Sequence, residues 1–306
     1  MTAGQQSGRA TARSVRRPRS DRAAYLYLLP AFVVLTLFLF VPLGHGAWIS
    51  LFDWDGLSVG TWTGFDNYVQ IVTDPSLRMA FVRSLVLILF FAVVPISLAL
   101  LLTMLMSRAN RLRGLGFFRV VIFLPQVVSS VVVGAIWVAI YAPNGVLNQF
   151  LSLIGLEAVT KPWLGDFTWA LPAVGLIGTW VTIGLCLVLF LAGISQIDPA
   201  LYEAARIDGA GMLREFFAVT LPGLRAQLAV ALTLTTVAAL RSFDLIYVAT
   251  RGGPGEATSV PAFQVYHLAF DLKQVGAAAA MGVALTTLIF GLTYLIGRID
   301  RQERQS

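Results

Sequence analysis

Hydrophobic and polar positions along this chain are grouped in long blocks rather than in short alternating patterns. Six apolar runs each reach the length of about 20 residues that a helix needs to cross the hydrocarbon core of a bilayer. Prolines within these runs are tolerated in membrane helices, where neighbours can satisfy the freed carbonyl groups. The pattern predicts six transmembrane helices, at residues 25–48, 81–106, 117–141, 171–194, 224–248 and 275–297.

The segments outside these runs are polar. Residues 1–24 are rich in Arg, Ser and Gly and contain almost nothing to bury, so we expect a disordered basic tail. No small-residue cleavage site follows promptly, which favours an uncleaved first helix over a signal peptide. We therefore expect a membrane domain at residues 25–298 and a short second tail at 299–306.

Composition excludes a soluble globular protein. Of the 306 residues, 57% are hydrophobic and 12% charged, with a mean hydropathy of +0.78, whereas soluble domains have about 25% charged residues. The single cysteine, Cys186, lies in an apolar run and excludes an internal disulfide. The fold class expected is an all-α integral membrane protein.

The location of the positive charge predicts the orientation. Sixteen Arg or Lys residues fall in the two tails and the loops on their side, against five in the loops on the other side. Positive residues concentrate in cytoplasmic segments, so both termini should be cytoplasmic. A nucleic-acid site would need a basic aqueous face with stacking aromatics, and the sequence offers none.

A polar island at residues 198–222 interrupts the apolar pattern between the fourth and fifth runs. Asp198-Pro199 predicts the start of a short helix, and Gly209 and Gly211 should end it. A second helix is expected at 212–219, ending before Leu221-Pro222. The result would be a cytoplasmic helix–turn–helix, either a solvated connection between two spans or a surface that another protein contacts.

The sequence of the island favours a surface that another protein contacts. The island contains Glu203-Ala204-Ala205 and Asp208-Gly209-Ala210, followed by Phe216 and Leu221-Pro222. This series closely resembles the EAA loop of permease subunits of bacterial ABC importers. The resemblance implies a coupling helix that docks on an ATP-hydrolysing subunit. The residues that would make this contact are Glu203, Ala204, Ala205, Asp208, Gly209 and Ala210.

A second informative stretch ends the fifth run. Arg241 and Asp244 are three residues apart, which places both on one face of a helix. Ionisable groups at membrane depth nearly always face a bundle interior or a wet cavity. They form either an ion pair that packs the bundle or part of the lining of a solute pathway.

The resemblance covers residues 28–297. The Gly-x-Asp-Asn-Tyr pattern at 64–68 resembles the first outer loop of sugar-importer permeases, and the Asn-Gly-Val-Leu-Asn pattern at 144–148 follows the same family. The stretch 243–254, which ends in Gly-Gly-Pro, resembles the larger permease type of carbohydrate importers, the maltose- and glycerol-phosphate-transport kind. The chain departs from the family at Arg83-Ser84, where Asn-Thr is usual. The resemblance implies the type I ABC importer permease fold.

The resemblance also implies which residues line the solute pathway, because polar groups just before the Gly-Gly-Pro turn contact the sugar in relatives. Aromatic rings could add stacking surfaces for sugar faces, although rings in membrane spans also serve as packing or as interfacial anchors. The candidates are Arg241, Ser242 and Asp244, followed by Trp137, Tyr141 and Trp180.

The chain lacks a motif for nucleotide chemistry. Its two lysines, Lys161 and Lys273, do not follow glycine, so a Gly-Lys phosphate cradle is impossible. ATP and Mg are therefore expected in partner ATPases, with no cofactor in this chain. We find no zinc-helix or Gly-x-Ser-x-Gly pattern, and we expect neither an enzyme nor a metal site.

These observations predict a sugar-importing permease subunit in a bacterial cytoplasmic membrane. Its expected partners are a second, related permease in a heterodimer, two ATPase subunits and an extracellular or periplasmic solute-binding protein. An importer of a sugar acid or glycerol phosphate is the alternative. A secondary transporter would need matching broken helices in internal repeats, and a membrane-embedded enzyme would need a clustered nucleophile or metal set; neither pattern is present.

Overall fold

The computed structural model describes residues 21–108 and 115–303. The first expected tail, 1–24, lies mostly outside these ranges and stays a prediction, whereas α16 (Val275–Glu303) continues into the second expected tail. Within the described residues, all regular secondary structure is helical apart from one two-stranded hairpin, which confirms the all-α prediction. Five helices are long and apolar enough to span a membrane, or six when one bent pair is counted as a span.

Residues 1–46 form one compact unit. Its described part consists of α1 (Asp21–Leu35), the π-helical turn η1 (Thr36–Phe40) and the start of α2 (Val41–Ile49). The helix begins four residues before the expected start at 25. No side chain in its most apolar window is buried by the unit itself.

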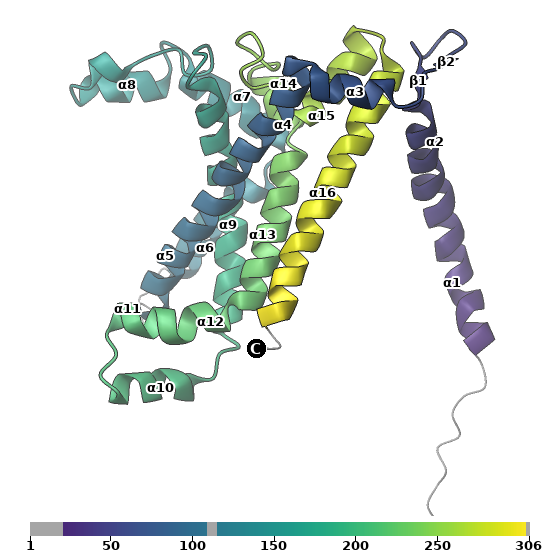
Figure 1. Cartoon of the computed structure of the whole chain (residues 1–306). Coiled ribbons are helices and arrows are strands. Elements are labelled where there is room, and N and C mark those ends of the chain that lie inside the picture. Colours follow the sequence, from purple (N-terminus) through teal and green to yellow (C-terminus); the bar gives the residue numbers. More distant parts are fainter. Residues whose placement is uncertain (1–20, 109–114, 304–306) are drawn as a thin grey trace, which may run out of the picture. The chain divides into compact units, whose positions relative to one another are not determined.

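Residues 47–306 form a second compact unit, which holds the remaining spans (Figure 1). The second span joins α4 (Pro75–Ile88), the π-helical η2 (Leu89–Val93) and α5 (Val94–Arg108). The other long helices are α9 (Ala170–Ile194), α13 (Arg225–Leu240) and α16 (Val275–Glu303). The shorter elements outside the polar island are α3 (Asp66–Thr73), α6 (Leu115–Val127), α7 (Ser130–Tyr141), α8 (Val146–Leu153), η3 (Glu157–Val159), α14 (Asp244–Ala249), α15 (Pro261–Tyr266) and η5 (His267–Asp271).

The second span begins at Pro75, six residues before the expected start. Asp74 caps the helix, because its side chain accepts a hydrogen bond of 2.8 Å from the backbone N–H of Ser76. Proline at the first helical position completes the start signal. The same Asp-Pro signal correctly predicted the start of the helix at 199. At residues 74–75 the signal was not used, because polar residues follow it and the apolar run begins later.

Two predicted spans are broken helices. The run 117–141 divides into α6 and α7 at Val128 and Ser129, and Ser129 has an extended backbone (φ −56°, ψ 135°). The run 224–248 divides into α13 and α14 at residues 241–243. Apolar length alone does not reveal such breaks, because the residues on both sides stay hydrophobic.

The proline in the second span does not break it, because α9 compensates for the missing donor. Pro95 cannot donate to Phe91, its partner four residues earlier. The hydroxyl of Thr182 on α9 donates to that carbonyl oxygen at 3.1 Å. The hydroxyl of Thr179 does the same for the carbonyl of Phe90. A neighbouring helix thus satisfies carbonyls that the π-turn and proline leave open.

Close backbone contact joins α9 to α6. A side chain at Gly184 would meet the carbonyl oxygen of Ile122 and the Cα of Phe123. Cys186, two residues further along α9, is fully buried in the same packed region. The absence of a Cβ at this one position allows the two helices to approach.

The Gly-x-Asp-Asn-Tyr pattern serves as a structural clamp. Strands β1 (Phe52–Asp53) and β2 (Thr61–Trp62) pair antiparallel. The amide of Asn67, at the start of α3, donates 2.9 Å hydrogen bonds to the carbonyl oxygens of Ser50 and Phe52. The Ser50 and Tyr68 hydroxyls lie 2.6 Å apart. These contacts hold the hairpin against the end of the α2 helix.

The Asn-Gly-Val-Leu-Asn pattern has a similar role. Asn148 is buried and donates to the carbonyl oxygen of Lys161 at 2.9 Å, while its own oxygen accepts from the indole N–H of Trp163 at 2.8 Å. This fastens α8 to the segment that leads into α9.

Candidate functional site

The polar island folds as predicted at its first helix. α10 runs Pro199–Ile207, and the Asp198 carboxylate accepts a 2.9 Å hydrogen bond from the N–H of Ala200. Within the second unit, α10 lies at the opposite end of the long helices from α14 and α15 (Figure 1).

The turn after α10 depends on Gly209. Its φ of +75° lies in the left-handed region, where a residue with a Cβ is strained. The N–H of Ala210 donates to the carbonyl of Ala205 at 2.9 Å, and the N–H of Gly209 donates to that of Arg206 at 3.0 Å. These two bonds form a Schellman cap, which closes the end of the helix.

The residues expected to contact an ATPase are mostly uncovered. Glu203, Ala204, Asp208 and Gly209 are exposed, and Ala205 and Ala210 are half-buried. The helical hairpin formed by the polar island, residues 198–223, also exposes large apolar side chains, and contiguous groups of such side chains are unfavourable in water. They are Leu201, Ile207 at 86% exposure, Leu213 and Phe217. The exposed surface of the hairpin therefore combines carboxylates with apolar groups.

Sequence reasoning missed two contacts that hold the hairpin closed. The Arg206 Nε lies 3.1 Å from Oε2 of Glu215, whose side chain is only 8% exposed. The hydrogen bond to Glu215 raises the pKa of the Arg206 guanidinium above its usual value. The Tyr202 hydroxyl lies 3.2 Å from the Thr220 hydroxyl. Opposite charges nine residues apart across the two glycines were the available signal.

The Tyr202 contact leads to a prediction. Tyr202→Phe should weaken closure of the hairpin by about 0.5–1.5 kcal/mol, the usual contribution of a hydrogen bond, and lower coupled ATPase stimulation by about two- to ten-fold. The measurement is ATP hydrolysis by the assembled transporter at saturating solute. Tyr294→Phe, which changes an exposed ring on α16, is the matched control. Equal activity in both variants would contradict the role of the contact.

The second helix of the island continues further than expected. α11 (Met212–Glu215), the π-helical η4 (Phe216–Thr220) and α12 (Leu221–Gly223) are consecutive, so the prediction that the helix ends before Leu221-Pro222 was wrong. The π-turn precedes Pro222, which cannot donate to the helix. The chain then bends by 71° into α13. The hairpin is therefore joined to the fifth span without a flexible loop.

The residues expected to line a pathway lie at the break between α13 and α14. Arg241 ends α13 (φ −94°, ψ 9°), and Asp244 is in the first turn of α14, so the prediction that both lie on one helix face was wrong. The Ser242 hydroxyl donates to the carbonyl of Ala239 at 2.7 Å, which favours the end of the helix there. No ion pair joins Arg241 to Asp244 in the described structure, and both are exposed.

The three aromatic candidates are brought together. The ring centroid of Trp137 on α7 lies 5.0 Å from that of Tyr141 and 5.6 Å from that of Trp180 on α9. The indole Nε1 of Trp137 is buried and has no acceptor within the described residues. A buried donor without a partner is rare and calls for an explanation. Trp137, Tyr141 and Phe243 border one hydrophobic cluster, which places the break and the rings in the same region.

Comparison with known proteins gives one family. Residues 96–305 match the profile of the binding-protein-dependent transport system inner membrane component. Bacillus subtilis YurN, a probable ABC transporter permease, is 34% identical, and the alignment covers 89% of this chain and 93% of that protein. The trehalose/maltose permease MalF of Thermococcus litoralis is 35% identical, with 92% and 96% covered. The diacetylchitobiose permease NgcF of Streptomyces coelicolor is 33% identical, with 91% and 84% covered.

A solved structure has the same fold. A chain of a bacterial ABC transporter that imports the acidic polysaccharide alginate superimposes with a TM-score of 0.74. It is 25% identical, and the match covers 92% of this chain and 96% of that one.

Proposed function

The chain belongs to the family of binding-protein-dependent transport system inner membrane components, and from that premise we propose that it carries a sugar through an ATP-driven importer. It is a multi-pass membrane permease subunit of the carbohydrate ABC importer type. The curated relatives that take up diacetylchitobiose, and trehalose or maltose, support a mono- or oligosaccharide as solute.

One observation carries the mechanism. The hairpin formed by α10 to α12 is closed by its own contacts, exposes Glu203 and Asp208 with apolar side chains, and continues into α13. A protein docked on this surface could move α13 because no flexible segment lies between them. We propose that one of two ATPase subunits docks there, that the other docks on the second permease, and that the ATPases bind the ATP and Mg. Both termini would then lie in the cytoplasm, as the distribution of positive charge predicts.

A second permease completes the proposed pathway. In this chain the break after α13 exposes Arg241 and Asp244 without an ion pair, and the described residues leave the Trp137 indole without an acceptor. Such groups suit a wet passage between two subunits. We propose a related but different permease as the mate, because a turn of the Gly-Gly-Pro type is expected on only one of the two. A solute-binding protein outside the cell would deliver the sugar.

Movement of the solute would follow alternating access, in which the pathway opens first to one side and then to the other. The ATPase cycle changes the relative stability of the two states through the docked hairpin. Asp244 and Ser242 would accept hydrogen bonds from sugar hydroxyls, and the rings of Trp137 and Trp180 would stack on apolar sugar faces.

The transport proposal is tested in proteoliposomes that contain the permease pair and the ATPases. We expect uptake of labelled maltose, trehalose or lactose to require ATP on one face and the binding protein on the other. Uptake should stop on ATP depletion while ion gradients are clamped. Continued uptake driven by an ion gradient alone would instead identify a secondary transporter. Stronger competition by galacturonate than by the neutral sugars would favour the sugar-acid alternative, to which Arg241 could contribute.

A further inference from the structure

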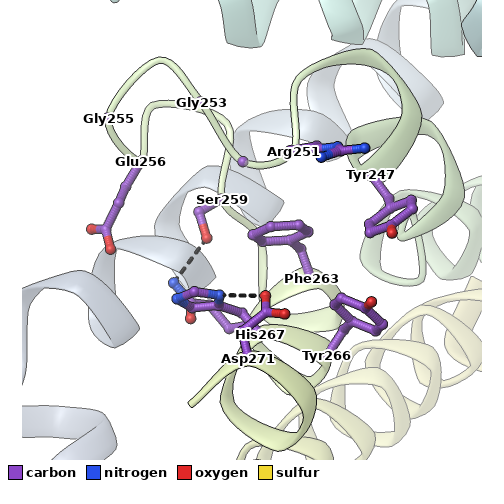
Figure 2. A pocket seen from close by; sticks show the side chains of 12 residues that line it. Tyr247, Arg251, Gly253, Gly255, Glu256, Ser259, Phe263, Tyr266, His267 and Asp271 are labelled. Atoms are coloured by element: carbon purple, nitrogen blue, oxygen red, sulfur yellow. Dashed lines mark hydrogen bonds and ion pairs between the residues drawn. The ribbon is translucent and has the colours of Figure 1, made fainter.

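A cavity of about 460 Å³ lies beside the Gly-Gly-Pro turn, away from the hairpin. Its walls come from the end of α14, the loop at residues 250–259, α15 and η5 (Figure 2). The volume is within the range of about 300–1,000 Å³ found for small-molecule sites. None of the residues proposed above for ATPase docking or for the pathway lines it.

Aromatic rings form one side of the cavity. The rings of Tyr247 and Tyr266 are 5.2 Å apart and nearly perpendicular, and Figure 2 shows Phe263 beside them. The Tyr247 hydroxyl raises the pKa of Tyr266 through a side-chain hydrogen bond. Such rings offer flat apolar faces next to hydroxyl groups.

Hydrogen-bond donors and acceptors complete the lining of the cavity. The Gln264 amide donates to the Ser259 hydroxyl at 2.9 Å, and both residues are buried. The Asp271 carboxylate lies 2.9 Å from Nδ1 of His267, whose ring stacks on Phe263 at 8°. One oxygen of Glu256 accepts from Ser76 at 2.7 Å. The Glu256 carboxylate also interacts electrostatically with Arg83.

The charges in the cavity favour a neutral ligand. Arg251 supplies one positive charge, with its guanidinium carbon 5.9 Å from the centre of the Tyr247 ring. Glu256 and Asp271 supply two negative charges, and Arg83, which interacts with Glu256, supplies a second positive one, so the charges around the cavity balance when His267 is neutral. An anionic solute would meet two carboxylates and would not be attracted.

Arg251 is also held in an uncommon backbone conformation. Its φ of +48° is in the left-handed region, which non-glycine residues seldom adopt. A residue strained in this way persists only when its surroundings hold it, and such residues cluster at functional sites. Here the residue in this conformation lines the cavity.

We propose that this cavity binds a neutral saccharide before it enters the pathway. Flat rings would stack on the apolar faces of the sugar, and Glu256, Asp271 and Gln264 would accept or donate hydrogen bonds at its hydroxyls. The site is separate from Arg241 and Asp244 and would be the first point at which the permease holds the released sugar. This inference rests on the proposed import of sugars and adds a second binding site to it.

The test measures binding to the permease pair with its ATPases in nanodiscs, without the binding protein. Maltose, trehalose and lactose are the probes, and saturation-transfer NMR titrations give the dissociation constants. We expect at least one probe to bind and both Tyr266→Ala and Asp271→Asn to weaken it at least ten-fold. Tyr266→Phe should retain most of the affinity because it keeps the ring. Tyr294→Ala, at an exposed ring on α16, should leave the affinity unchanged.

Three outcomes would overturn the proposal. The first is that no probe binds. The second is that the wild type and both cavity variants bind the probe with equal affinity. The third is that the cavity variants keep their sugar affinity but need a higher concentration of binding protein to stimulate the ATPase. The last outcome would identify the cavity as a docking site for the binding protein. Uptake by the wild-type proteoliposomes separates a failure of the import proposal from a failure of the cavity proposal. If the wild type takes up sugar in an ATP-dependent way and the cavity variants bind it as well as the wild type does, only the cavity proposal fails.

Discussion

Gly209→Val should lower ATP-dependent uptake at least ten-fold while the permease still accumulates in the membrane. Gly209 has a φ of +75° at the end of α10, and a β-branched residue is strongly disfavoured there. Relief of the strain would open the Schellman cap formed by Ala205 and Ala210. α10 would then no longer present Glu203 and Asp208 in a fixed orientation. Uptake and ATPase stimulation in proteoliposomes are the measurements.

Gly211 provides the control for this experiment. Its φ of −72° is accessible to any residue, and a Cβ there has no neighbour within 4 Å in the described structure. Gly211→Ala should therefore retain nearly full activity. Glu203→Ala is the companion variant, because it removes a docking carboxylate without affecting the turn. Normal uptake and ATPase stimulation in both Gly209→Val and Glu203→Ala would show that the hairpin does not couple the two reactions.

Gly184→Val should prevent accumulation of folded protein. A side chain at this position would meet the backbone of α6 at Ile122 and Phe123, and backbone atoms cannot move aside as a flexible side chain can. Overpacking in a protein core costs about 1–3 kcal/mol and sometimes more. The upper end applies here because α6 and α9 would have to separate. We expect a large fall in membrane yield and a lower unfolding temperature in detergent.

The matched variant is Gly282→Ala on α16. A Cβ there has no neighbour within 4 Å in the described chain, and alanine favours a helix over glycine by up to about 1 kcal/mol. Its yield and unfolding temperature should equal or exceed those of the wild type. If Gly184→Val also kept a wild-type unfolding temperature, the close packing of α6 on α9 would not be required for folding.

Much of the fold could be predicted from composition and local signals. The apolar runs predicted the long helices because burying backbone groups in lipid leaves the helix as the main solution. Asp198-Pro199 and Gly209 predicted both ends of α10, because a cap and a left-handed turn are local requirements. The resemblance of the island and of the Gly-Gly-Pro stretch identified the family, which the comparisons confirmed.

The breaks in the helices and the contacts between distant segments could not be predicted from composition and local signals. Arg241 and Asp244 were predicted on one helix face, but the helix ends between them, where Ser242 donates to its own backbone. The Arg206–Glu215 contact and the cavity lined by Tyr266 and Asp271 each join segments that meet only after folding.

Pro95 separates what the sequence determined from what only the tertiary structure decided. The sequence by itself determined that the chain is a helical membrane protein with a polar hairpin, because apolar length and capping residues act locally. It could not determine whether a proline interrupts its helix. Pro95 leaves its span continuous because Thr182 of α9 supplies a donor to the carbonyl of Phe91. That outcome was decided by the tertiary structure, since a freed carbonyl in a membrane must find its donor on another helix.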